Sequence, residues 1–356
     1  MNESVLSFKD KYFGDKNFYK MTLTIAVPII IQNLLTNLVS MADNIMVGQL
    51  GTNQMSGVAI INQLFFVFNL LVFGGMSGAG LFSAQYFGQK NHNGVRDVFR
   101  MKILIGITII AISLSVMIFL HEPLINMFLH EGSSSGNIQE TFNYAKNYLY
   151  IMVIGIAPFV ISNCYSTTLK ESGQTVVPMK AGVLAVVFDI VLNYIFIFGK
   201  LGFPAMGVVG AAIATVISRF VECGYLVIYT HRHSNDYPFI KHCYRTLKVP
   251  GSLVKKIIIT GAPLMLNEFL WAGGLTLQTQ ALSTKGLATV GGLNICNTIG
   301  NISNCIFVTM GTTIAIVVGQ LLGAGKLKEA KVTATRMAAF SLLISFGMII
   351  ILGLLG

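Results

Sequence analysis

Long apolar segments alternate with short polar segments along the whole chain. Stretches such as 101–120, 207–229 and 330–355 reach or exceed the roughly 20 residues that an α-helix needs to cross the hydrocarbon core of a bilayer. Dividing the chain at its polar segments predicts about nine membrane-spanning helices, at residues 20–48, 55–86, 98–120, 143–168, 179–199, 207–229, 254–283, 289–322 and 330–355. The pattern therefore predicts an all-α polytopic membrane protein.

The chain also repeats itself at a fixed shift of 235 residues, without gaps. The shift pairs identical residues: Pro28 with Pro263, Gly51 with Gly286, Asn69 with Asn304, Gln85 with Gln320, and Gly88 with Gly323. Both copies begin with a span that runs in the same direction, so the repeats are parallel. Six spans make one copy and the second copy stops after three, which predicts two six-helix lobes with an incomplete second lobe.

This repeat predicts how the chain is divided. Residues 1–230 form an N-terminal six-helix lobe, 231–252 an inter-lobe loop, and 253–356 three helices of a C-terminal lobe. The sequence is expected to be a piece of a longer protein with roughly a hundred further residues, enough for the three missing spans. Paired lobes of this kind usually hold a substrate pathway between them near the midplane of the membrane.

Composition and charge agree with a membrane protein. The chain is 54% hydrophobic and only 11% charged, against about 25% charged residues in soluble domains. The net charge of +10 is spread over many short segments, so no nucleic-acid partner is expected. With a cytoplasmic N-terminus, the inner segments hold most of the 24 Lys and Arg residues, Lys102 and Lys170 among them. The positive-inside rule then predicts this orientation, in a plasma (inner) membrane.

Three carboxylates fall deep inside predicted spans: Asp43, Asp189 and Glu268. A charge in hydrocarbon costs several kcal/mol, so each is a candidate functional residue. Asp43 lies fifteen residues after Pro28 on the first span, and a proline inside a helix permits a bend. The alternative is that Asp43 is a buried acid satisfied by neighbouring amide and hydroxyl groups.

Asp189 and Asn193 are four residues apart on the fifth span, so they share one face of its helix. With Asp43, and with Thr215 on the sixth span, they predict a cation-binding and coupling site. Such oxygen ligands suit a sodium ion, and two carboxylates can also share a proton. No other metal and no cofactor is expected, although Asn193 alone could be ordinary helix packing.

Glu268 follows Pro263 by five residues and repeats the order of a proline and then an acid. It is predicted to attract a cationic substrate or to take up a proton, and the alternative is a structural hydrogen bond. Pro28 and Pro263 are the predicted helix bends. The chain contains no G-x-x-x-x-G-K-[ST] phosphate loop, which argues against direct use of ATP.

Five motifs together resemble the multidrug and toxic compound extrusion (MATE) family. They are MADNIMVG at Met41–Gly48, SAQYFGQK at Ser83–Lys90, TLKESGQTVVPM at Thr168–Met179, FPAMGVVGAAIAT at Phe203–Thr215 and VGQLLGAGK at Val318–Lys326. The resemblance implies two V-shaped lobes around a central cavity. It also implies antiport of amphipathic, often cationic compounds against sodium ions or protons.

The resemblance also carries over to single residues. The first-span Asp of the family falls on Asp43, its sixth-span Thr on Thr215, and the seventh-span acid of several branches on Glu268. The fifth-span pair of the family is commonly Asn and then Asp four residues later. This chain reads Asp189 and then Asn193, so the coupling ion stays open.

The expected function is therefore secondary active export of small amphipathic or cationic organic compounds by alternating access, and no enzyme activity. We expect a monomer that contacts only its substrates and the bilayer. One alternative is a flippase of lipids or lipid-linked precursors, which would show a groove lined by basic residues; among the predicted spans, Arg219 stands out as such a residue. Another is an intramembrane enzyme that uses Asp43 and Asp189 as an acid pair.

Overall fold

The computed structural model describes residues 11–129, 137–283 and 287–355, and these residues form helices and no strand. The first group of helices is α2 (Lys16–Gly48), α3 (Thr52–Gly88), α4 (His92–Phe119), α5 (His121–Asn126), α6 (Ile138–Met152), η2 (Val153–Gly155), α7 (Ile156–Glu171), α8 (Val176–Phe198) and α9 (Val208–Arg232). Two short helices, η3 (Pro238–Ile240) and η4 (Cys243–Arg245), precede α10 (Gly251–Ser283), α11 (Leu287–Gly323) and α12 (Leu327–Leu355).

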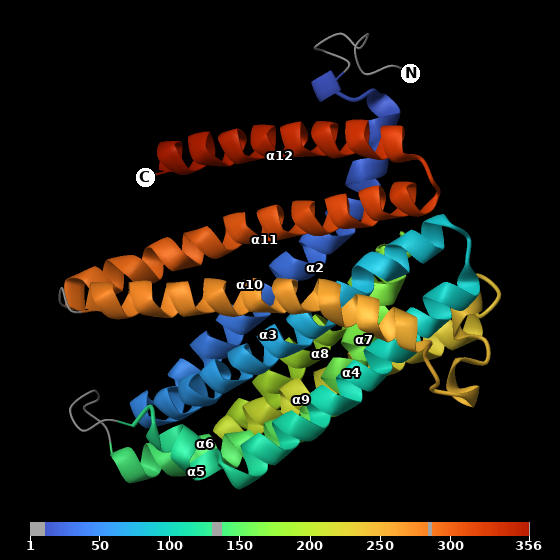
Figure 1. Ribbon diagram of the computed structural model, residues 1–356. Helices are drawn as coiled ribbons and strands as arrows, with labels where there is room; N and C mark the ends of the chain where they lie inside the picture. The colour runs from blue at the N-terminus through green and yellow to red at the C-terminus, as the bar shows by residue number, and fades with distance from the viewer. Residues whose placement is uncertain (1–10, 130–136, 284–286, 356) are drawn as a thin grey trace.

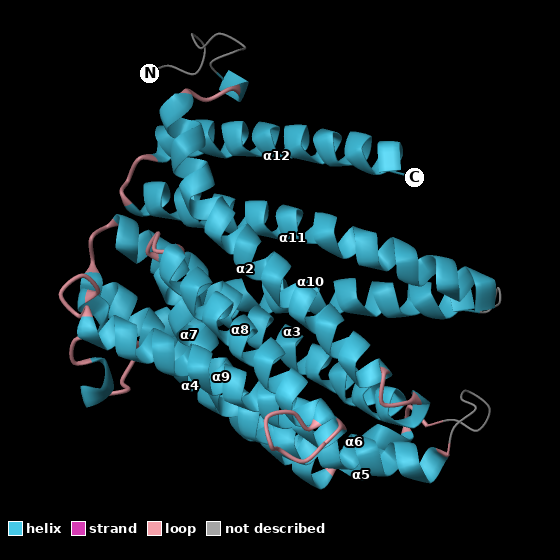
Figure 2. Ribbon diagram, turned by 180° about the vertical axis from the view of Figure 1, so that it is seen from behind, coloured by secondary structure: helices cyan, strands magenta, loops and turns pink. Residues whose placement is uncertain are grey.

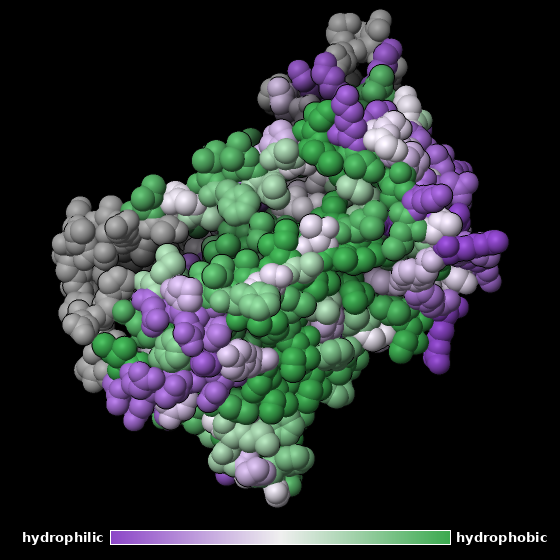
Figure 3. Space-filling view, turned by 60° about the horizontal axis from the view of Figure 1, so that its bottom comes forward, coloured by the Kyte–Doolittle hydropathy of each residue, from purple (hydrophilic) through white to green (hydrophobic). Residues whose placement is uncertain are grey.

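Within the described residues, 8 helices are long and apolar enough to cross a membrane. The fourth of them is continuous through α6, η2 and α7, at Ile138–Glu171. The seventh predicted span, 254–283, lies within α10, which is helical over 33 residues but is not among the eight. Apolar side chains cover the middle of the face shown in Figure 3 and polar side chains gather toward its ends, as a bilayer requires.

The helix bounds confirm the repeat. α2 and α10 both have 33 residues, α3 and α11 both have 37, and the start of each second-copy helix lies 235 residues after its counterpart. α12 likewise begins 235 residues after α4. Figure 1 shows the second group, α10, α11 and α12, running side by side, while α3 to α9 of the first group are tilted against them. The turned view in Figure 2 shows the same two groups.

The two groups meet closely where α3 crosses α11. A Cβ atom at Gly88 would lie 2.0 Å from the backbone oxygen of Gln320, and one at Gly323 would lie 1.9 Å from the backbone oxygen of Gln85. Gly88 and Gly323 are repeat partners, as are Gln85 and Gln320, so the crossing is symmetric. Only glycine permits this approach, because every other residue carries a Cβ atom.

The segment after α9 is held against α4 by two arginines. Arg96 donates to the backbone oxygens of Phe239 and Pro238, both at 3.3 Å, and Arg100 donates to that of Cys243 at 2.9 Å. Each arginine thereby gives backbone carbonyl groups of η3 and η4 a side-chain donor from α4. These basic residues therefore fix the segment between α9 and α10.

One basic residue of the predicted inner segments lies elsewhere. Lys102 is 0% exposed within α4, and its ammonium nitrogen lies 2.6 and 2.7 Å from the two carboxylate oxygens of Glu171 on α7. The hydroxyls of Thr167 and Thr168 accept from the same nitrogen. Lys102 therefore lies inside the third predicted span, 98–120, and an ion pair that joins α4 to α7 compensates for its burial.

Candidate cation site and substrate cavity

Four polar residues that the sequence singled out come together between α2, α8 and α9. The side-chain amide nitrogen of Asn193 donates to Asp43 Oδ1 at 2.7 Å and to Asp189 Oδ2 at 3.1 Å. Asp189 and Asn193 share a face of α8 and are both buried, whereas Asp43 on α2 is half-buried. A single amide group therefore bridges carboxylates that are 146 positions apart in the chain.

The two carboxyl groups lie beside one another, because both accept from the one side-chain amide nitrogen of Asn193. Their charges interact, and Thr215 on α9 lies close enough to interact with Asp189 as well. Two ionised carboxylates in contact repel each other unless a proton or a cation lies between them. The geometry can therefore hold one of these between α2 and α8.

Ser218 is a residue of this cluster that the sequence reasoning missed. Its hydroxyl donates to Asp189 Oδ1 at 3.2 Å and also contacts the backbone oxygen of Ala214 at 2.9 Å. Helical spacing could have found it, because Ser218 follows Thr215 by three residues and lies on the same face of α9.

Asn193 also leaves one oxygen unused. The residue is 0% exposed, yet its Oδ1 atom has no hydrogen-bond partner. A buried polar atom without a partner costs about 1–3 kcal/mol, so it marks a place where a ligand can be accommodated. Carboxylate, amide and hydroxyl oxygens are suited to a hard cation, so the residues present fit a sodium ion as well as a proton.

Both predicted bend positions lie inside helices. Pro28 is buried within α2, and Pro263 is exposed within α10. Pro28 has no N–H group, so the carbonyl oxygen of Thr24, four residues earlier, loses its helical donor. The hydroxyl of Thr175, just before α8, donates to this oxygen at 3.4 Å. The residue that compensates for the missing N–H group of Pro28 is therefore Thr175, at the start of the helix that carries Asp189.

α2 also contacts the second group of helices through its polar residues. Asn33 donates to the Thr309 hydroxyl at 3.0 Å, and Asn37 lies 2.7 Å from the sulfur of Cys305, both on α11. α2 thus contacts the cation cluster on α8 on one side and α11 on the other.

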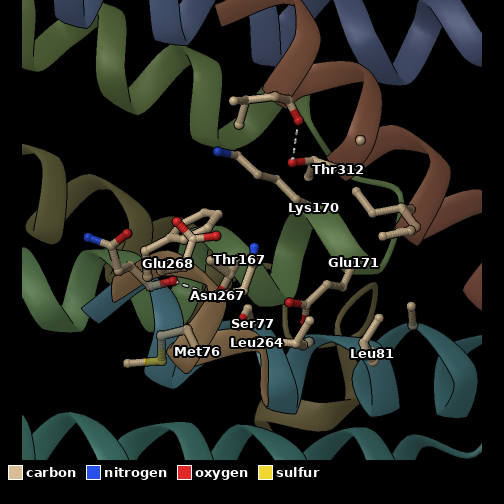
Figure 4. A pocket seen from close by; sticks show the side chains of 18 of the residues that line it. Met76, Ser77, Leu81, Thr167, Lys170, Glu171, Leu264, Asn267, Glu268 and Thr312 are labelled. Atoms are coloured by element: carbon tan, nitrogen blue, oxygen red, sulfur yellow. Dashed lines mark hydrogen bonds between the residues drawn. The ribbon is translucent and has the colours of Figure 1, made fainter. Parts of the chain in front are cut away.

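Glu268 lies apart from the cation cluster, in a cavity of about 540 Å³ between α3, α7, α10 and α11. Glu268 and Trp271 reach it from α10 and Lys170 from α7, and Figure 4 shows the Lys170 and Glu268 side chains extending into the same space. Within the described ranges, neither has an oppositely charged partner within 4.0 Å. Glu171 also lines the cavity, but it is paired with Lys102, so Glu268 and Lys170 are the acidic and the basic group of the lining that lack a close ion-pair partner among the described residues.

Comparison with known proteins adds to this geometry. The sequence model of the MatE family matches residues 28–195 and 263–355. The chain is 30% identical over 308 residues to "Probable multidrug resistance protein NorM" of Thermotoga maritima, covering 86% of this chain and 64% of that protein. It is 28% identical to the protein of the same name from Halalkalibacterium halodurans, covering 88% of this chain and 66% of that protein. The chain thus spans just under two thirds of the length of these relatives.

Solved structures show the same fold. One, described as the "Outward-facing conformation of a multidrug resistance MATE family transporter of the MOP superfamily", is 22% identical, with a TM-score of 0.78 over 94% of this chain and 70% of that chain. The bent form of the Vibrio cholerae MATE transporter VcmN is 18% identical, also with a TM-score of 0.78, over 90% of this chain and 70% of that one.

Proposed function

The chain belongs to the MatE family, whose members are transporters rather than enzymes, and on that premise we propose that it serves as a secondary active antiporter. It exports small amphipathic or cationic organic compounds through a plasma membrane in exchange for sodium ions or protons. We further propose that it works as a monomer with a cytoplasmic N-terminus. The end where α3 meets α4 is then the cytoplasmic end.

The amide bridge from Asn193 to both Asp43 and Asp189 is the observation that carries this proposal. A membrane protein that needed only packing at this position would use apolar residues, because each carboxylate costs several kcal/mol in the bilayer. The bridging Asn193 amide and the unused Asn193 Oδ1 atom complete a set of oxygen ligands. Binding and release of a cation would explain why the protein keeps two carboxylates at this place in the membrane despite their free-energy cost.

The cavity supports the proposed class of substrate. Its volume of about 540 Å³ suits a small organic molecule. Trp271 and Phe73 offer aromatic surface for an amphipathic compound, and Glu268 offers a negative charge for a basic group. Lys170 is the one basic residue among the described residues that line the cavity. A flippase with a basic groove is therefore the weaker alternative.

α2 is the element that can couple the two sites. It carries Asp43 toward α8, and it carries Asn33 and Asn37 toward α11. Loading of the cation favours the arrangement of α2 that binds it better, and the bend that Pro28 permits lets this arrangement differ between two states. The effect on substrate affinity is limited to the difference in cation affinity between those states.

Gradient-driven efflux by the full chain in vesicles tests the proposal, with an imposed sodium gradient in one arm and an imposed pH gradient in the other. Asp43→Asn is expected to keep the fold and to reduce coupled efflux at least about tenfold, since a neutral amide cannot load a cation or proton in the same way. The matched control is Glu329→Gln, which removes an exposed carboxylate that pairs with Lys326. Full efflux by Asp43→Asn in both arms contradicts the proposal.

A further inference from the structure

Arg219 is a half-buried cation near the carboxylate pair, and its Nη1 atom is fully buried. It follows Ser218 directly on α9, and its charge interacts with those of Glu222 and Asp189. Its guanidinium carbon lies 5.4 Å from the ring centre of Phe65 and 5.1 Å from that of Phe159. The guanidinium therefore interacts with two aromatic rings, one from α3 and one from α7.

These rings keep Arg219 from being an ordinary salt-bridge partner. In the part of the chain that the structure describes, no carboxylate oxygen lies within 4.0 Å of its nitrogens. Its Nη1 atom is buried without a hydrogen-bond partner. The backbone of Gly155 also approaches closely, since a Cβ atom there would lie 3.2 Å from Arg219 Cδ and 3.3 Å from Nη1. The guanidinium is therefore fixed near the acids but held out of contact with them.

Such an arrangement needs a physical reason. A buried guanidinium without a carboxylate in contact is costly, and two cation–π contacts offset only part of that cost. The remaining compensation comes from the field of the neighbouring carboxylates, Glu222 and Asp189. The benefit is mutual, because two adjacent carboxylates are also unstable in a medium of low dielectric constant.

We propose that Arg219 is a tethered counter-ion that sets the number of positive charges this site loads to one. Two carboxylates and one guanidinium leave a net charge of −1, which one sodium ion or one proton neutralises. The membrane interior favours the neutral cluster, so loading stops there. This inference rests on the proposed cation site.

The other groups around Arg219 leave this count unchanged. Glu222, less than one turn further along α9, interacts with both Lys170 on α7 and Arg219. Lys170 is the first of these two partners, and its positive charge balances that of Glu222. Tyr148 of α6 is buried beside Arg219 and is neutral in its protonated form. The charge of the cluster therefore depends on Asp43, Asp189 and Arg219.

The test measures the positive charge bound by the purified full chain. Sodium binding is measured with radioactive sodium, and proton uptake is measured with a pH-sensitive dye. The sum of the two gives the positive charge loaded per protein molecule. The wild-type chain is expected to load one positive charge and Arg219→Met two, whereas Arg219→Lys keeps the charge and is expected to load one. Arg219→Gln serves as a second neutral variant in case the methionine variant does not fold.

Calcium provides an independent measurement. A site of charge −2 attracts a divalent cation more strongly, so Arg219→Met is expected to bind Ca²⁺ at least about tenfold more tightly than the wild-type chain. A role in packing alone would not create this gain. If wild type and Arg219→Met load the same charge, or bind Ca²⁺ with the same affinity, the role proposed for Arg219 is wrong while the proposed cation site stands. A wild-type chain that loads no positive charge contradicts the proposed cation site as well.

Discussion

Adding one methyl group where α3 crosses α11 tests how closely the two helix groups must approach. In Gly88→Ala the new Cβ atom would lie 2.0 Å from the Gln320 carbonyl oxygen and 2.8 Å from its Cα atom. These are backbone atoms, so no side-chain rotation relieves the clash. A close carbon–oxygen contact is about 3.3 Å, so the helices must separate locally by about 1.3 Å. Gly323→Ala requires nearly the same movement on the other side.

Forced overpacking of this kind costs about 1–3 kcal/mol. That energy acts on the conformation in which α3 and α11 are in contact, so the population of this conformation is expected to fall by about 5–150-fold relative to one in which they are apart. Spin labels at the exposed positions Lys90 and Lys326, at the same ends of α3 and α11, measure the separation directly. The label distance is expected to lengthen, and transport by the full chain is expected to slow.

The matched control is Gly300→Ala on α11, where a Cβ atom would have no neighbour within 4 Å among the described residues. It should leave both the label distance and the transport rate at wild-type values. If Gly88→Ala also leaves both unchanged, the close crossing is not part of the working protein and the reasoning fails.

Three further predictions concern single contacts. Glu171→Gln is expected to lower the free energy of unfolding by about 3–5 kcal/mol, because it leaves the Lys102 ammonium buried without its counter-charge. Replacing both residues by apolar ones should restore most of this loss. An unchanged melting temperature in Glu171→Gln would refute the role of the ion pair. Thr175→Val removes the donor to the Thr24 carbonyl and is expected to lower the free energy of unfolding, measured by thermal denaturation, by about 0.5–1.5 kcal/mol. An unchanged free energy of unfolding would show that the Thr24 carbonyl needs no such donor. Burial raises the pKa of the Cys243 thiol to about 11, despite the nearby Arg100, so the thiol stays protonated at pH 8. Alkylation of Cys243, measured by peptide mass spectrometry, should be slow at pH 8 and accelerate as the pH approaches 11. Rapid modification of the folded chain at pH 8 would contradict this prediction.

The cation cluster shows how far sequence reasoning can reach. A buried acid is costly in any fold, so Asp43 and Asp189 could be singled out without coordinates. The spacing of four residues placed Asn193 on the face of Asp189. The bridge from Asn193 to Asp43 could not be derived, because it depends on how α2 packs against α8. The role of these residues in coupling stays a prediction.

Lys102 and Arg219 show where local reasoning failed or stopped short. From the sequence, Lys102 was counted with the basic residues of the inner segments, and Arg219 stood out only as a basic residue within a predicted span. Lys102 instead pairs with Glu171, 69 residues away, and Arg219 interacts with the rings of Phe65 and Phe159. No periodic pattern in the sequence predicts such contacts, because the partner residues lie on other helices.

The sequence by itself determined that this chain is a bundle of membrane helices with a 235-residue repeat, because helix length and hydropathy are set by the thickness of the bilayer and the repeat is a property of the letters. Only the tertiary structure decided which polar groups meet. It placed Asp43 against Asp189, Glu268 in a separate cavity with Lys170, and Gly88 on the backbone of α11. The physical reason is that helix packing depends on the shapes of two surfaces at once, whereas each span is specified by its own residues alone.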